Sequence, residues 1–165
     1  MLWHSSRLLF AMAAVMIRPL EPNDILKLVS LGKEMHQAGH FKDTEYCEKK
    51  VINLLMSVLD NDYQCCCVSV VNGEIIGMFI GFITTYYFGN TLTSNDYLLF
   101  VSEKHRGGSS GIKMLHYYIK WAESAGVTRR NIRLGNSAEI AVDAVDRLYK
   151  HVGFRSHGTL YVLED

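Results

Sequence analysis

The sequence predicts a mixed α/β domain built on a central, mostly antiparallel sheet. Apolar residues recur with helical spacing after Ile25 and again after Val51, which indicates two early helices. Residues 64 to 87 then have an extended pattern that is interrupted by Asn72-Gly73, the strongest short hairpin signal. Strand and helix patterns alternate in the last third of the chain. This order of elements is typical of a single α/β layer architecture.

The individual elements follow from local signals. Asn23 or Asp24 supplies a cap for the first helix, Gly39 separates it from the second, and Gly153 ends the last one. In chain order, we expect a strand at 17–20, helices at 24–38 and around 51–58, strands at 64–71, 75–87 and 96–101, a helix from 111, a strand at 131–135, a helix at 138–151 and a closing strand at 159–163.

Length and composition favour one ordinary globular domain. A chain of 165 residues fits one hydrophobic core, so we expect a domain over residues 16–165 that follows an extension over residues 1–15. Lys plus Arg and Asp plus Glu both count 17, which gives a formal net charge of zero. Because nucleic-acid binders carry a basic surface, nucleic acid is not expected as a partner.

Three of the four cysteines are consecutive, at residues 65 to 67, within a predicted strand. Successive side chains of a strand point to opposite faces, whereas a zinc site needs spaced pairs of ligands. The pattern therefore predicts buried thiols in a reducing compartment, with no metal site and no disulfide framework. A catalytic Cys–His pair stays open as an alternative.

The first fifteen residues resemble a short signal sequence, because Arg7 precedes an apolar run and Ala11-Met12-Ala13 has cleavage-like spacing. A tail, a cleaved signal and a membrane anchor are all compatible with this segment, and we expect a tail. No stretch approaches the roughly 18 to 20 apolar residues that span a bilayer, so no membrane span is predicted.

The segment from Arg106 to Gly111 carries the clearest chemical signal. It follows a predicted strand and opens directly into a helix, and its glycines and serines let backbone N–H groups approach a phosphate. The helix N-terminus adds unpaired donors and partial positive charge. The segment thus predicts a phosphorylated ligand, with a plain Gly-rich connection as the alternative, and it matches neither the P-loop nor the dinucleotide-binding fingerprint.

This segment resembles the acetyl-CoA signature of GNAT N-acetyltransferases, Gln/Arg-x-x-Gly-x-Gly/Ala, except that Ser109 replaces the middle glycine. Residues 148 to 154 are similar to the second hallmark of that family, Leu-Tyr-x-x-x-Gly-Phe, and the likeness covers residues 16 to 165. Met35-His36 and residues 86 to 89 also resemble a GNAT subgroup often encoded by tailed bacteriophages.

The resemblance implies a GNAT fold, with six to seven strands splayed at the cofactor site and about four helices. It implies direct transfer of acetyl from acetyl-CoA to a primary amine, without a metal. The family commonly has a cofactor-contacting Asn where this chain has Val142, so that contact is either absent or replaced, with Asn136 or Ser137 as the candidates. The cofactor-binding residues implied in this way are Phe100, Val101, Arg106, Gly107, Gly108, Ser109, Ser110, Gly111 and Asn136.

For the chemistry, the resemblance implies Tyr149 as the general acid, since the family places a tyrosine there near the thiolate. Asp96 and Glu103, at the two ends of the strand before the loop, are candidates for the general base. A water chain to bulk solvent is the alternative. The same strand is expected to offer a backbone N–H to the oxyanion and to pair with the pantetheine arm.

Two other functions remain open at this stage. The first is a binding or structural module with the GNAT fold, for instance a phage virion component, that has weak or no turnover. The second is a nucleotide-binding protein for a different phosphate ligand. The sequence does not identify the amine acceptor. A homodimer is possible. The expected location is the cytoplasm of a bacterium or of a phage-infected host.

Overall fold

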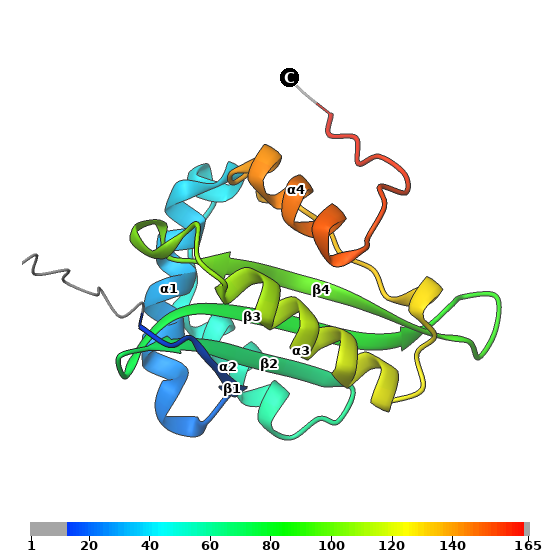
Figure 1. Ribbon diagram of the computed structural model, residues 1–165, viewed down its shortest axis with the longest axis horizontal. Coiled ribbons are helices and arrows are strands. Elements are labelled where there is room, and N and C mark those ends of the chain that lie inside the picture. The colour runs from blue at the N-terminus through cyan, green and yellow to red at the C-terminus, as the bar shows by residue number, and fades with distance from the viewer. Residues whose placement is uncertain (1–12, 164–165) are drawn as a thin grey trace, which may run out of the picture.

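The computed structural model describes residues 13–163, so most of the predicted extension at 1–15 lies outside the described residues. Figure 1 shows a sheet with helices on both faces. The strands are β1 (Met16–Pro19), β2 (Gln64–Val71), β3 (Glu74–Thr85) and β4 (Leu92–Val101), and the helices are α1 (Ile25–Ala38), α2 (Glu48–Leu59), α3 (Ser110–Ser124) and α4 (Val142–Val152). Single 3-10 turns lie at Pro22–Asp24, His40–Asp43, Glu103–His105 and Arg129–Asn131.

The four strands form one antiparallel sheet in the order β1-β2-β3-β4. The predicted hairpin between β2 and β3 is confirmed: Asn72 and Gly73 both have positive φ, 50° and 77°, which matches a type I′ turn. The register of β3 against β4 shifts between Ile80 and Gly81. This irregularity lies close to Asp96, the partner of Gly81.

The expectation of six to seven strands is wrong for the described residues, where the sheet has four. At 131–135 the chain makes only a single parallel bridge, between Ile132 and Ser94. The Arg133 N–H donates to the Ser94 carbonyl of β4 at this bridge, and side chains satisfy backbone groups beyond it: the Arg133 carbonyl accepts from the Tyr118 hydroxyl, and the Gly135 N–H donates to Asp96. The bridge then leaves the rest of β4 unpaired on that edge.

The closing strand expected at 159–163 is also absent, since this segment makes no backbone hydrogen bond to the described part of the chain. Leu160 is 71% exposed and Leu163 is 98% exposed. Helix α4 begins at Val142 rather than at residue 138, since Glu139 and Ala141 have φ of 55° and 47°, which is incompatible with a continuous helix. Its predicted end is confirmed: Gly153 is the C-cap, with φ of 109°.

Each face of the sheet has its own hydrophobic cluster, because successive strand residues point to opposite faces. Met78 packs with Leu28 of α1 and Leu55 of α2. On the other face, Phe79 packs with Met114 and Tyr118 of α3, the helix that crosses the front of the sheet in Figure 1.

The consecutive cysteines are divided between these two faces, Cys66 on one and Cys65 and Cys67 on the other, and all three are buried free thiols. Burial raises the pKa of Cys65 to about 12, so the thiol stays protonated. Among residues 13–163, no cluster of three His, Cys, Asp or Glu side chains could hold a metal ion. Within the same range, every helix is too short or too polar to cross a membrane.

Candidate active site

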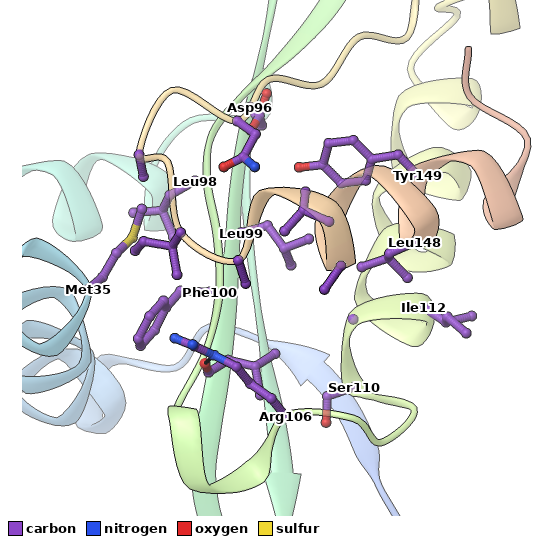
Figure 2. Close-up of a pocket in the computed structure, with 18 of the residues that line it drawn as sticks. Met35, Asp96, Leu98, Leu99, Phe100, Arg106, Ser110, Ile112, Leu148 and Tyr149 are labelled. Carbon is purple, nitrogen blue, oxygen red and sulfur yellow. Dashed lines mark hydrogen bonds between the residues drawn. The ribbon is translucent and has the colours of Figure 1, made fainter. Parts of the chain in front are cut away.

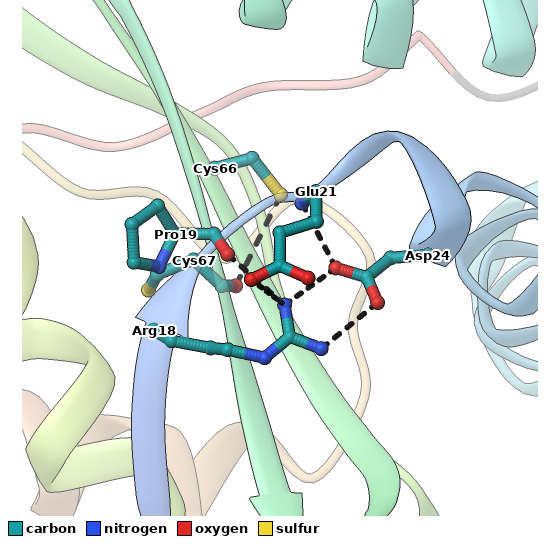
Figure 3. Close-up of polar contacts among 6 residues, drawn as sticks. All are labelled: Arg18, Pro19, Glu21, Asp24, Cys66 and Cys67. Atoms are coloured by element: carbon teal, nitrogen blue, oxygen red, sulfur yellow. Dashed lines mark hydrogen bonds and ion pairs between the residues drawn. The ribbon is translucent and has the colours of Figure 1, made fainter.

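A cavity of about 270 Å³ lies where β4 loses its outer partner. Its walls come from β4, the loop before α3, helix α4, Met35 of α1 and the segment 135–141, which we call the strap (Figure 2). The lining residues are Met35, Asp96, Tyr97, Leu98, Leu99, Phe100, Val101, His105, Arg106, Gly107, Gly108, Ser110, Gly111, Ile112, Gly135, Asn136, Ser137, Ala138, Ile140, Ala141, Ala144, Val145, Leu148 and Tyr149.

The outer edge of β4 presents backbone groups to this cavity. The Ser102 N–H donates to the Ile76 carbonyl of β3, so the residues that alternate with Ser102 direct their backbone groups to the other edge. The Val101 carbonyl lies on that edge, where it accepts a hydrogen bond from Arg106 Nε at 3.0 Å. By the same alternation, the Leu99 N–H and the Val101 N–H face the cavity.

The loop from Arg106 to Gly111 forms one end of the cavity. Gly107 has φ of 85°, and a Cβ added there would meet no atom within 4 Å, so the backbone conformation is what requires glycine. Ser109 makes no side-chain cap to α3, so the first N–H groups of the helix are not used by a capping side chain. His105 Nδ1 is buried without a hydrogen-bond partner in the described part of the chain. These donors and the open glycines fit a phosphate group.

Other residues of the loop hold it in place. Ser110 is buried, and its Oγ accepts a hydrogen bond from Ser69 Oγ at 2.8 Å, which fixes the first turn of α3 against β2. A Cβ on Gly111 would lie 2.9 Å from Leu148 Cδ2, which shows that Gly111 lets α3 approach α4. The Arg106 guanidinium lies 5.4 Å from the centre of the buried Phe100 ring, in cation–π geometry.

At the other end of the cavity, Asp96 and Tyr149 bind opposite ends of the same residue, Gly135. The Gly135 N–H donates to Asp96 Oδ1 at 2.8 Å, and the Tyr149 hydroxyl donates to the Gly135 carbonyl at 2.9 Å. Figure 2 shows the two side chains converging on this end from β4 and α4. Burial raises the pKa of Asp96 to about 6, and it also raises the pKa of Tyr149. The pair therefore combines a carboxylate that accepts protons near neutral pH with a phenol that keeps its proton.

The structure does not bring every predicted site residue into the cavity. Glu103 is exposed and absent from the lining, and its N–H donates to Glu34 Oε1 at 3.2 Å. Ser109 also lies outside the lining, although its neighbours on both sides belong to it. The remaining predicted residues, Asp96, Phe100, Val101, Arg106, Gly107, Gly108, Ser110, Gly111, Asn136 and Tyr149, all line the cavity.

Sequence reasoning proposed Asn136 and Ser137 of the strap, but it missed the rest of the strap and Met35 as lining residues. The strap is attached to the end of α1, where the His40 N–H donates to the Ala138 carbonyl at 2.9 Å. Its Ile140 packs against the cluster of α1 and α2. No sequence signal could have found this contact, because it joins residues that lie far apart in the chain.

Comparisons with known proteins identify the family to which this chain belongs. The model of the acetyltransferase (GNAT) family matches residues 29–154, which is most of the chain, so the protein belongs to the GNAT acetyltransferase family. No curated protein matches the sequence significantly.

Solved structures agree on the fold. A predicted acetyltransferase from Clostridium acetobutylicum, solved with acetyl-CoA, has a TM-score of 0.74 and 18% identity over 92% of this chain and 96% of its own. An aminoglycoside N-acetyltransferase, solved with the bisubstrate analogue CoA-S-monomethyl-acetylneamine, has a TM-score of 0.73 and 14% identity over 93% of this chain and 99% of its own. The ribosomal-protein-alanine N-acetyltransferase of Brucella melitensis biovar Abortus 2308 has a TM-score of 0.66 and 17% identity over 92% and 99%.

Proposed function

We propose that the protein is an acetyl-CoA-dependent N-acetyltransferase that moves the acetyl group directly to a primary amine of a small molecule or protein. The observation that carries the proposal is the cavity, which joins a glycine-containing anion loop, the free edge of β4 and the Asp96–Gly135–Tyr149 arrangement. Similar structures solved with acetyl-CoA or a CoA-based bisubstrate analogue support this assignment.

The residues present fit acetyl-CoA. The backbone N–H groups of residues 107–111, together with Arg106, would hold the pyrophosphate. The backbone of β4 beside Phe100 and Val101 would pair with the pantetheine arm as a strand edge pairs with a neighbour, and Asn136 would add a side-chain contact from the strap. Bound in this way, acetyl-CoA supplies an acetyl group activated as a thioester.

The chain would contribute three functions to the transfer. The Asp96 carboxylate accepts the proton that the attacking amine loses. The Leu99 or Val101 N–H donates to the oxygen that becomes negatively charged when the amine adds to the acetyl carbon. The Tyr149 hydroxyl then donates a proton to the departing sulfur. The acetyl carbon gains a bond to nitrogen and loses its bond to sulfur, and no covalent enzyme intermediate forms.

Free CoA released from acetyl-CoA, measured with a thiol reagent, tests this function against a panel of polyamines, aminoglycosides, amino acids and peptide N-termini. We expect amine-dependent release with at least one class. Release that no amine increases, from a protein that binds acetyl-CoA, would contradict the transferase assignment.

A binding or structural module with the GNAT fold, such as a phage virion component, is the second candidate. Two positions favour it: Ser109 replaces the usual glycine, and Val142, where the family commonly has Asn, is 51% exposed and outside the cavity lining. If acetyl-CoA does not bind even at millimolar concentration, the result supports a binding or structural module without turnover.

A further inference from the structure

The cavity also indicates what kind of amine it accepts. We propose that the acceptor is a monoamine with an apolar body, rather than a polyamine or an aminoglycoside. This inference rests on the proposed function and deepens it, because it concerns the half of the cavity that the anion loop does not use.

The side chains of β4 line two sides of the cavity. Leu99 and Val101 belong to the cluster of α3, the helix whose N-terminus carries the anion loop. Leu98 and Phe100 belong to the opposite cluster, which contains α1 and α2. Because the pantetheine arm would lie along the free edge of β4, an acceptor that approaches the acetyl group from the side of Leu98 and Phe100 meets the wall from α1 and the strap.

That wall is apolar. Met35 of α1, Leu98 of β4 and Ile140 of the strap pack on one cluster, and all three line the cavity. Figure 2 shows Met35 and Leu98 directed into the same part of it. The buried Ala138 adds a small apolar surface beside them. A hydrocarbon body gains free energy on such a surface, whereas a charged group there loses its hydration.

The charges lead to the same conclusion. Asp96 is the only carboxylate among the residues that line the cavity. The Glu34 carboxylate accepts hydrogen bonds from Ser102 and Glu103, and Glu139 Oε2 lies 3.9 Å from His40 Nδ1. When one amine has given its proton to Asp96, a second ammonium group on the same molecule finds no negative partner in the cavity.

A pair of nearly isosteric amines tests the inference. Pentylamine and 1,4-diaminobutane have equal numbers of non-hydrogen atoms, and they differ in whether the distal atom is a methyl or an ammonium group. We expect kcat/KM for pentylamine to exceed that for 1,4-diaminobutane by about tenfold or more. Equal values, or a preference for the diamine, would overturn the proposal.

The variant Met35→Glu, with Met35→Gln as its control, tests whether the apolar wall at Met35 determines the amine preference. Both side chains are unbranched and of similar size, but only the glutamate provides a second carboxylate. Met35→Glu is expected to reduce the pentylamine preference by about tenfold relative to Met35→Gln. An equal preference in the two variants would show that Met35 does not face the acceptor and would count against the proposal.

Binding of acetyl-CoA, measured separately by calorimetry, distinguishes failure of the acceptor class from failure of the proposed function. Acetyl-CoA binding with turnover only on polyamines, or with turnover on neither amine, overturns the acceptor class and leaves the cofactor site standing. Absence of acetyl-CoA binding overturns the proposed function, and the acceptor class fails with it.

Discussion

Asp96 owes its proposed role to burial. Its folded-state pKa of about 6 lies above the usual value of 3.8, although the Gly135 N–H stabilises the charged form. A base must be deprotonated to act, so we expect kcat/KM to fall as the pH drops through about 6. Asp96→Asn can still accept from the Gly135 N–H, and it should lower kcat/KM by roughly 10²- to 10⁴-fold and remove this acid limb. Steady-state rates across pH provide the measurement.

The stability of the same variant serves as its control. Because the folded pKa is raised, the contribution of Asp96 to stability is fully present below the unfolded pKa and is lost as the pH rises through about 6. Asp96→Asn should therefore unfold at the same or a higher temperature than the parent at neutral pH. An acid limb that persists in a folded Asp96→Asn would assign the base to another group or to water.

Tyr149 supplies the second prediction at this scale. Its hydroxyl donates to the Gly135 carbonyl, and burial raises its pKa, so it carries a proton at neutral pH. Tyr149→Phe should lower kcat with little change in the affinity for acetyl-CoA, because the ring still packs against Phe154. Turnover equal to that of the parent would remove Tyr149 from the acid role.

The sequence could predict these residues individually but could not rank them. In the sequence, Asp96 and Glu103 lie at the two ends of the strand predicted at 96–101 and are equivalent candidates for the base. The structure starts that strand at Leu92, so Asp96 lies within β4 and beside the strap, whereas Glu103 is exposed outside the cavity and its backbone N–H donates to Glu34. The distinction depends on tertiary contacts that no local pattern encodes.

Among the elements, the strap is the part that closes the acceptor side. Gly39 permits its attachment: a Cβ there would lie 2.7 Å from the Ala138 carbonyl oxygen, although its φ of −109° suits any residue. Gly39→Ala should displace the strap and cost about 1 to 3 kcal/mol of folding free energy. Thermal unfolding measures this loss of stability. An increase in KM that is larger for the acceptor than for acetyl-CoA locates the effect on the acceptor side. An unchanged melting temperature would show that the strap moves freely.

Sequence patterns predict those helices, turns and helix ends that depend on interactions between residues close together in the chain. The Asn72-Gly73 turn, the amphipathic helices and the Gly153 stop all follow from short-range rules. The strap does not, since Glu139 and Ala141 have positive φ without being glycine, and tertiary contacts must hold them there. The segment 131–135 has the pattern of a strand, but it makes only one bridge to β4, and side chains satisfy the Arg133 carbonyl and the Gly135 N–H.

Across the whole molecule, residues 155–163 stand apart from the fold. No amide in this segment donates a backbone hydrogen bond to any part of the chain that the structure describes. Its amides should therefore exchange hydrogen with solvent far faster than those of the buried strand β2. Hydrogen exchange followed by mass spectrometry reads both segments in one experiment. Protection of residues 159–163 comparable to that of β2 would show that the segment pairs with a strand edge.

The central claim is that acetyl-CoA binds at the loop from Arg106 to Gly111, and calorimetric titration tests it most directly. Gly107→Val places a branched side chain at a φ of 85°, whereas Gly158→Val does the same at a φ of 90° outside the cavity. We predict micromolar binding to the parent and to Gly158→Val, and binding at least about tenfold weaker to Gly107→Val. No binding to the parent at millimolar acetyl-CoA, or equal affinities for the two variants, would contradict the account.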